Sequence, residues 1–504
     1  MSKRAGVFIA VLALWIGTAA AQDARRVLEA AASAMGAEKL SSVQYSATGW
    51  QGIVGQSASP TEDWPKVELA SYTRTVDFAS MSSKEEITRR QGKYPPRGGG
   101  AGFPIVGEQR QVSLVSGNYA WNMQGNDAAP VPNQAERRQL EIMLLPHGFL
   151  KAAMASNATA VTRVDHERPE TVVSFKAFGK YLVNGTISNE NMVTRVLTWI
   201  PDPAFGDMIL TQRFSGYKDY NGVKFPSMIH QHTGEMALNP GRNSLEIYVS
   251  DVKVNVSGAA LTVPDNVRQA KAPAVRVESE KLADGVWRLA GGSHHSLLIE
   301  FRDFVTVIEA PLNEERSLAV IAEVAKLVPN KQIRYVVNTH HHLDHSGGLR
   351  TYIAYGATVV TQEANRDFYE RVLFAPWPRT LAADRLALYP REAYLEPVYS
   401  KYVLSDGTRN VDLYHVPSPH AEGMMMVYLP KEKILVTADL WSPLAPGRQP
   451  PTATAGAIAV YNAIKRQKLA VDRIVGIHGG IDPMSNMESI VGPVAATQGP
   501  GGEG

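Results

Sequence analysis

One stretch decides the fold of the second half of this chain: Thr339-His340-His341-His342-Leu343-Asp344-His345-Ser346-Gly347-Gly348. It follows the apolar run Ile333-Arg334-Tyr335-Val336-Val337, which predicts a buried strand. The pattern His-x-His-x-Asp-His therefore places imidazole and carboxylate groups in a loop at the end of a strand. These are ligand types that Zn²⁺ and its first-row neighbours accept, so the stretch predicts a metal site.

Three later segments offer the same kinds of side chain. His420 lies in the turn-rich segment 416–423, Asp439 ends the run 434–439, and His478 ends the run 473–478. Each lies close to the point where an apolar run meets a turn, which is how a scaffold of buried strands presents ligands at one edge. Two ions sharing such a set could activate water between them, so the pattern predicts a hydrolytic site. A chance run of histidines is the alternative.

The four segments, in this order, resemble the metallo-β-lactamase-fold superfamily of hydrolases, from about Val275 to Met487. The resemblance implies an αββα sandwich with two metal ions at one edge, expected to be Zn²⁺, with Fe or Mn as alternatives. By position, one ion would take His340, His342 and His420. The other would take Asp344, His345 and His478, with Asp439 bridging both.

The same resemblance implies the reaction. We expect an ester, thioester, lactone or amide to be cleaved by a metal-bridging hydroxide, with Asp344 as the catalytic proton carrier. Relatives that open β-lactams generally lack a carboxylate at the station of Asp439, and redox di-iron relatives place Glu where this chain has His342. Both activities are therefore disfavoured. A mononuclear iron oxidoreductase similar to persulfide dioxygenases, and a non-enzymatic lipid or metal carrier, remain as alternatives.

Other polar residues near these segments receive structural interpretations. His341 is expected to point away from the ions and His415 to serve packing. His294 and His295 are expected to be structural turn residues, with a place at the mouth of the pocket as the alternative. Glu309 stands where many relatives carry Asp, which leaves its part in the site open.

The N-terminus and the composition predict location and partners. Residues 1–21 combine a basic start, a short apolar centre and an Ala-x-Ala end, which predicts a signal peptide cut after Ala21 and a periplasmic or secreted protein. A retained membrane anchor is the alternative. The 504 residues include no Cys, which excludes disulfides and thiolate chemistry, and the net charge of +2 gives no reason to expect nucleic acid or a membrane as partner. The expected partner is a small-molecule substrate, with an apolar one as an option.

Residues 22–272 predict a separate β-rich domain. A helix is expected from Asp23 to Met35, alternating strands follow, and a helical interruption is expected over 136–154. The segment 214–226 resembles the strand-turn-strand of outer-membrane lipoprotein-sorting proteins. That resemblance implies a curved antiparallel sheet whose apolar concave face either holds a substrate or packs on the second domain.

The expected fold class is therefore α+β, with the catalytic domain over 273–490 and a disordered tail over 491–504. Residues 368–403, rich in aromatics and Pro, predict either a lid over the metals or a surface excursion. Because all proposed ligands follow Val275, we expect the second domain to hold its metals without the first.

Overall fold

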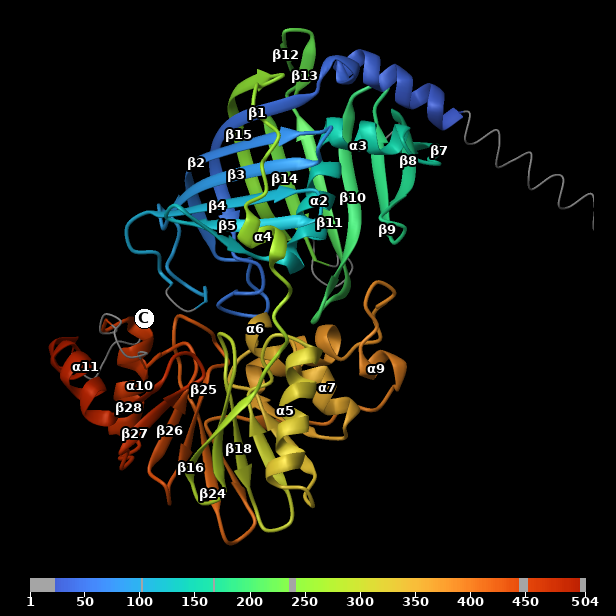
Figure 1. Ribbon diagram of the computed structural model, residues 1–504. Coiled ribbons are helices and arrows are strands. Elements are labelled where there is room, and N and C mark those ends of the chain that lie inside the picture. Colours follow the sequence, from blue (N-terminus) through green and yellow to red (C-terminus); the bar gives the residue numbers. More distant parts are fainter. Residues whose placement is uncertain (1–22, 101–102, 166–167, 235–241, 444–451, 499–504) are drawn as a thin grey trace, which may run out of the picture.

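The computed structural model describes residues 23–100, 103–165, 168–234, 242–443 and 452–498, and these form two stacked domains (Figure 1). The class is α+β, as predicted: a large antiparallel sheet comes first and an αββα sandwich second. The predicted signal peptide lies outside the described residues. Among the described helices, none combines the length and the apolar character that a membrane span requires.

The N-terminal domain is built on one antiparallel sheet, with 13 strands among the described residues. Across the sheet the strands lie in the order β6-β5-β4-β3-β2-β1-β15-β14-β11-β10-β9-β8-β7, so the first strand of the chain pairs with the last strand of the domain. Inward and outward side chains alternate along β2, as the sequence predicts for a half-buried strand. The strands are β1 (Ser42–Gly52), β2 (Lys66–Asp77), β3 (Ser82–Arg90), β4 (Gln109–Ser116), β5 (Tyr119–Gln124), β6 (Asp127–Pro130), β7 (Thr159–Asp165), β8 (Arg168–Ala177), β9 (Tyr181–Ile187), β10 (Val193–Asp202), β11 (Gly206–Ser215), β14 (Met228–Thr233) and β15 (Arg242–Val254).

Helices occupy much of the concave side of this curved sheet (Figure 1). The predicted helical interruption consists of two helices, α2 (Ala135–Met143) and α3 (Pro146–Met154). Pro146 begins the second helix, because proline breaks a helix in its interior but is tolerated in the first turn. α2 contacts β3 to β5 and α3 contacts β8 and β10, so the pair lies between the two halves of the sheet. The Phe149 ring occupies the place where Gly185 has no side chain. The domain's own helices thus cover much of the apolar face that was a candidate for substrate binding.

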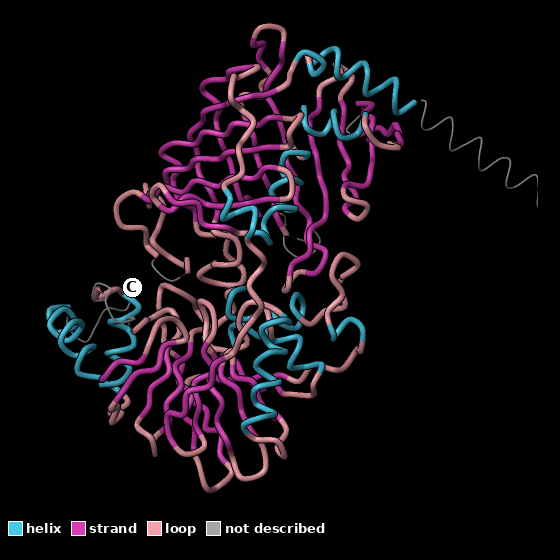
Figure 2. The backbone as a smooth tube through the Cα atoms, viewed as in Figure 1, coloured by secondary structure: helices cyan, strands magenta, loops and turns pink. Residues whose placement is uncertain are grey.

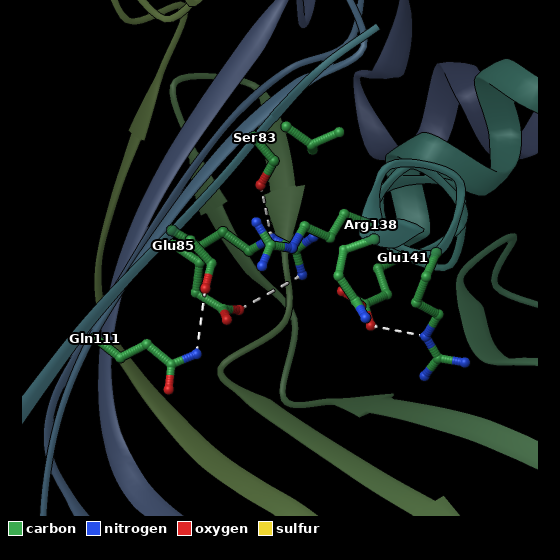
Figure 3. Close-up of a pocket in the computed structure, with 10 residues that line it drawn as sticks. Ser83, Glu85, Gln111, Arg138 and Glu141 are labelled. Atoms are coloured by element: carbon green, nitrogen blue, oxygen red, sulfur yellow. Dashed lines mark hydrogen bonds and ion pairs between the residues drawn. The ribbon is translucent and has the colours of Figure 1, made fainter. Parts of the chain in front are cut away.

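A charged pocket of about 170 Å³ remains between α2 and the sheet (Figure 3). Two of its arginines are held by neighbouring side chains: Arg74 donates through Nε to Ser83 at 3.0 Å and lies 3.9 Å from Glu85. Arg137 pairs with Glu141 at 3.0 Å. A second, largely apolar pocket of about 330 Å³ lies beside α3.

The predicted hairpin within 214–226 is present as β12 (Lys218–Tyr220) and β13 (Val223–Phe225). The helix predicted near the N-terminus spans residues 23–35. After α4 (Asp265–Gln269), an extended stretch leads to the second domain near residue 275, where the sequence suggests the boundary.

The second domain packs two sheets face to face, with helices on both outer sides (Figures 1 and 2). One cluster of buried apolar side chains fills the space between the sheets and continues under the helices beside the second sheet. Another lies under the helices beside the first sheet and also includes the core of the N-terminal domain. The first sheet contains β16 (Glu278–Ala283), β17 (Val286–Ala290), β18 (Ser296–Glu300), β19 (Val305–Ile308), β20 (Ile333–Val337), β21 (Thr358–Gln362) and β22 (Leu395–Val398). The second contains β23 (Lys401–Ser405), β24 (Asn410–His415), β25 (Met425–Leu429), β26 (Ile434–Thr437), β27 (Arg473–Gly476) and β28 (Ile481–Pro483). The outer helices are α5 (Glu314–Leu327), α7 (Leu349–Ala354) and α9 (Arg385–Leu388) on one side, and α10 (Ala455–Arg466) and α11 (Met484–Gln498) on the other.

Two expectations for this domain are wrong. Residues 491–498 are not a disordered tail, because α11 continues through Pro493 to Gln498 and packs on α10. The middle of 368–403 is not a free surface excursion. It docks on the first domain, where the Arg379 guanidinium donates to the carbonyls of Pro203 and Ala204 at 3.0 and 2.8 Å.

Candidate metal centre

Every predicted ligand lies in a loop or a short helix at the edge of the sandwich that faces the first domain. The cluster His340 to His345 follows β20 and runs into the short helix α6 (Leu343–Ser346). His420 lies between β24 and β25, Asp439 follows β26, and His478 follows β27. The central strands are buried and apolar, so the chain leaves the core at the points where polar side chains begin.

The first group consists of His340, His342, His420 and Asp439, whose candidate ligand atoms lie within 4.8 Å of one another. Nε2 of His420 is 3.3 Å from Nε2 of His340 and 3.4 Å from Oδ2 of Asp439. Two ligands of one tetrahedral zinc ion, each about 2.0–2.1 Å from it, are separated by about 3.3–3.4 Å. The spacing therefore fits a single ion between these side chains.

The second group consists of Asp344, His345, His478 and, in addition, His294. Nε2 of His478 is 3.2 Å from Nε2 of His345 and 3.0 Å from Oδ1 of Asp439. Nε2 of His345 lies 2.8 Å from the same Asp439 oxygen. Asp439 thus directs Oδ1 toward the second group and Oδ2 toward the first, which is the arrangement that a bridging carboxylate requires.

Hydrogen bonds hold the outer nitrogen of several of these imidazoles. His345 donates through Nδ1 to Glu309 at 2.8 Å, His478 through Nδ1 to the Ser293 carbonyl at 3.0 Å, and His342 through Nε2 to the Ser57 carbonyl at 2.9 Å. Such partners fix the tautomer and the ring orientation, and they leave the other nitrogen free for a metal.

The structure shows what Glu309, which stands where many relatives carry Asp, does in the site. Its carboxylate is fully buried and accepts from His345 through Oε2 and from the Thr339 backbone N–H, 2.6 Å away, through Oε1. The residue has φ = 72°, an uncommon backbone conformation for a side chain other than Gly. Glu309 therefore links the start of the ligand loop to one of its ligands.

Burial sets the protonation of the first group. It lowers the pKa of His340, His342 and His420, so their imidazoles are neutral near pH 7 and can offer a lone pair. Burial also opposes a charge on His345, but the nearby carboxylates of Asp439 and Glu309 outweigh it and raise the pKa of His345 well above its usual value. The carboxylates therefore favour positive charge at this point.

Three atoms in the centre test whether the site fits a metal. Nδ1 of His342 is buried without a hydrogen bond in the described part of the chain, and the two buried Asp439 oxygens face imidazole nitrogens at 2.8 to 3.4 Å without a well-formed hydrogen bond. Buried polar atoms of this kind are costly unless something binds them. Together with the nitrogen and oxygen donor set, they fit divalent cations.

The structure corrects the interpretation of His294. Its Nε2 lies 3.2 Å from Oδ2 of Asp344, and its ring centroid is 4.1 Å from that of His478. Sequence reasoning treated it as a turn residue, although a Gly-Gly-Ser-His-His turn between two strands was a usable signal. His295 does serve its turn, since it accepts from the Gly291 N–H through Nδ1, 3.2 Å away.

The other two histidines lie where they were expected. His341 belongs to neither group and turns its Nε2 toward the Ser57 hydroxyl at 3.5 Å. His415 donates through Nε2 to the Glu422 carbonyl at 2.9 Å, which supports the turn before His420.

Comparison with known proteins agrees with the fold. Residues 289–478 match the family model of the metallo-beta-lactamase superfamily, so the C-terminal domain belongs to that superfamily. A metallo-beta-lactamase from Pontibacter korlensis is 19% identical, with 42% of this chain and 96% of that chain covered and a TM-score of 0.32. FIM-1 from Pseudomonas aeruginosa, in a mono-zinc form, is 21% identical, with 45% and 97% covered and a TM-score of 0.34. The metal-soaked Flv1 flavodiiron core from Synechocystis sp. PCC6803 is 16% identical, with 43% and 60% covered and a TM-score of 0.35.

A comparison with curated protein sequences gives no match. Membership of the superfamily and the two groups of His and Asp side chains together support a metal-dependent, hydrolase-like function.

Proposed function

We propose that this protein is a dinuclear metal-dependent hydrolase that cleaves an ester, thioester, lactone or amide bond. One observation carries the proposal: Asp439 directs one oxygen to each of two complete groups of ligand atoms. A mononuclear site would leave one of these groups, and one carboxylate oxygen, without a partner.

His340, His342 and His420 would hold one ion, and Asp344, His345 and His478 the other, with Asp439 shared. When bound, such a pair lowers the pKa of water to give a nucleophile near neutral pH and polarises the acyl oxygen of the substrate. The charges support two ions. Glu309, Asp344 and Asp439 bring three negative charges, which one divalent cation would leave partly uncompensated.

Asp344 is the residue best placed to move a proton. Its side chain is 28% exposed, whereas those of Asp439 and His345 are fully buried, so it lies on the side of the centre open to substrate. Burial opposes ionisation of Asp344, but the hydrogen bond from His294 and the nearby His345 outweigh it and lower its pKa, so the carboxylate is ionised. His294 shares Oδ2 of Asp344 and can orient it toward the leaving group.

The donor set suits zinc, because it contains imidazole and carboxylate and no thiolate. Iron and manganese accept the same ligands, so metal content is the first measurement. Elemental analysis of the full-length protein should give two zinc ions per chain. Turnover on panels of esters, thioesters, lactones and amides should disappear with a chelator and return with Zn²⁺.

The alternatives give different results in the same experiment. One iron per chain with oxygen consumption on a persulfide would replace the hydrolase with an oxidoreductase. Bound metal, or none, without turnover on any panel would favour a carrier.

We also propose that the protein is exported, because residues 1–21 have the composition of a signal peptide. Mass measurement of protein recovered from its native host should give a chain that begins at or near Gln22. A chain that retains residues 1–21 in most molecules would instead indicate an anchor.

A further inference from the structure

The connection between β1 and β2, residues 53–65, leaves the N-terminal sheet and enters the edge of the sandwich where the metal groups lie. It has no helix or strand, yet residues 55–59 are all buried. Its backbone pairs with both ligand loops: the Leu343 N–H donates to the Gly55 carbonyl at 3.1 Å, and the Glu422 N–H donates to the Ala58 carbonyl at 2.7 Å. The loop therefore lies between the His340 loop and the His420 loop.

Ser57 determines which nitrogen of His342 faces the ligand group. Its backbone carbonyl can only accept, so the contact of 2.9 Å requires a proton on Nε2 of His342. The neutral ring then has its lone pair on Nδ1, the atom that is buried without a hydrogen bond. A group from the first domain thus sets the tautomer of a proposed ligand in the second.

Gln56 acts on Asp344 in a similar way. Its side-chain nitrogen donates to Oδ1 of Asp344 at 2.7 Å, while Oδ2 faces His294 and the second group. The carboxylate only accepts, which assigns the nitrogen of the amide to this contact. With one oxygen held by Gln56, the Asp344 carboxylate cannot rotate freely, and Oδ2 stays directed at the centre.

The first domain also fixes the position of the loop. Arg242, at the start of β15, donates to the Pro60 carbonyl at 2.6 Å, and its guanidinium lies 4.4 Å from the centre of the Trp64 ring. The Gly99 N–H donates to the Gln56 carbonyl at 2.8 Å. Gly55 has φ = 80°, and a Cβ there would come within 2.5 Å of the Leu343 side chain. The loop is therefore held from both sides in one conformation.

We propose that Gln56 and Ser57 of the N-terminal domain are positioning residues of the metal centre, so that the two domains form one composite site. This inference rests on the proposed function, because it assumes that the two groups hold metal ions. Its consequence is specific: Gln56 should control the ion bound through Asp344, and the Ser57 carbonyl should control the ion bound through His342.

The test measures the affinities of the full-length protein for its two zinc ions by competition with a chromophoric chelator. The substitution Gln56→Met keeps the length of the side chain and removes the donor. Partners of this kind typically contribute about 10- to 100-fold to metal affinity. We expect one ion to bind about 10- to 100-fold more weakly, the other to bind unchanged, and kcat to fall with little change in KM. The matched control is Val54→Ala in the same loop, at a side chain that is exposed in the structure, which should leave both affinities unchanged.

A second variant tests the Ser57 carbonyl, which no side-chain substitution removes. Gly55→Ala places a Cβ against Leu343 and should displace the loop, so both ions should bind more weakly. Wild-type affinity for both ions in Gln56→Met and in Gly55→Ala would overturn the inference. Equal loss of both ions in Gln56→Met, together with a lower unfolding temperature, would also overturn it, because that is the result of general destabilisation. If the wild-type protein binds no metal, the proposed function fails instead.

Discussion

The two domains contribute to the metal centre in different ways. The C-terminal domain supplies every candidate ligand found among the described residues, each from a loop or a short helix close to a buried strand. Among its described residues the N-terminal domain supplies no candidate ligand, but one of its loops holds His342 through the Ser57 carbonyl and Asp344 through the Gln56 amide. The comparison teaches that a ligand and the group that orients it can come from separately built parts of a chain.

This comparison adds a condition to the expectation that the second domain holds its metals alone. All the candidate ligands do follow Val275. Without the first domain, however, His342 and Asp344 would each lose a hydrogen-bond partner, and the backbone N–H groups of Leu343 and Glu422 would lose theirs. We therefore still predict that the second domain alone binds its metals, but more weakly than the full-length protein does.

The largest effect is expected when a ligand of the C-terminal domain is replaced. His342→Ala removes a ligand and should lose one ion and lower kcat by about a thousandfold, or roughly 4 kcal/mol of transition-state stabilisation. Its neighbour provides the control: His341→Ala should keep both ions and most of the activity, because His341 belongs to neither group. Elemental analysis beside kinetics measures both. Two ions and normal turnover in His342→Ala would make the ligand assignment wrong.

A somewhat smaller effect is expected at Asp344, where the two domains meet. Asp344→Asn keeps the shape and the capacity to accept from Gln56, but it removes the charge that accepts a proton. We expect kcat to fall by about 10²-fold, at the lower end of the usual contribution of a positioned acid or base. Steady-state kinetics at saturating zinc isolates this effect from metal loss. An unchanged kcat would eliminate the proton-carrying role.

Glu309 allows a direct comparison with Gln56. Both side chains orient a ligand, but Glu309 belongs to the same domain as the ligands and Gln56 to the other domain. Glu309→Gln can still accept from the Thr339 N–H but removes the charge beside His345. We expect about 10- to 100-fold weaker binding of one ion, similar to the effect of Gln56→Met. Chelator competition on both variants compares an orienting group from each domain. A Glu309→Gln protein with wild-type affinity would show that this carboxylate serves only the backbone.

The smallest effect on the metal centre is expected at His147, in the core of the first domain. Burial lowers the pKa of His147 to about 4, from an ordinary value of 6.5. The unfolded chain therefore binds more protons than the folded one between these values, and folding stability falls as the pH drops from about 6.5 to about 4, by about 3 kcal/mol in total. His147→Gln can still donate to the Met35 carbonyl but does not titrate. Unfolding free energies of both proteins across this pH range should diverge below pH 6.5, with metal affinity at pH 7 unchanged in the variant. Parallel curves would contradict a neutral, buried His147.

The sequence predicted what depends on local pattern. Strands of the first domain alternate as in β2, and the pattern His-x-His-x-Asp-His, with three later residues, led to seven side chains that the structure brings into two adjoining groups. It did not predict that His294 reaches Asp344, because that contact depends on how the β17–β18 turn meets the β20 loop.

The role of Gln56 could not be predicted from the sequence at all. Gln56 lies 288 residues from Asp344 in the chain, inside a loop that resembles any other polar connection. A side-chain amide carries no chemical signature of its own, and only the packing of the two domains gives it a partner. The end of α11 was missed because a Pro at 493 and a glycine-rich terminus suggest disorder, whereas packing on α10 keeps residues 491–498 helical.

The place of β1 in its sheet has a consequence for how the chain folds. Val43 pairs with Val254 and Gln51 pairs with Leu245, so the strand that begins the sheet lies beside the one that completes it. Contacts so distant along the chain require a large loop to close before they stabilise anything, and they are typical of slow folding. The loop that carries Gln56 and Ser57 follows β1 directly. The earliest part of the metal centre in the chain therefore depends on residues some two hundred positions later for a fixed place. The first of its proposed ligands, His340, comes nearly a hundred positions after those, and the last, His478, comes more than two hundred after them.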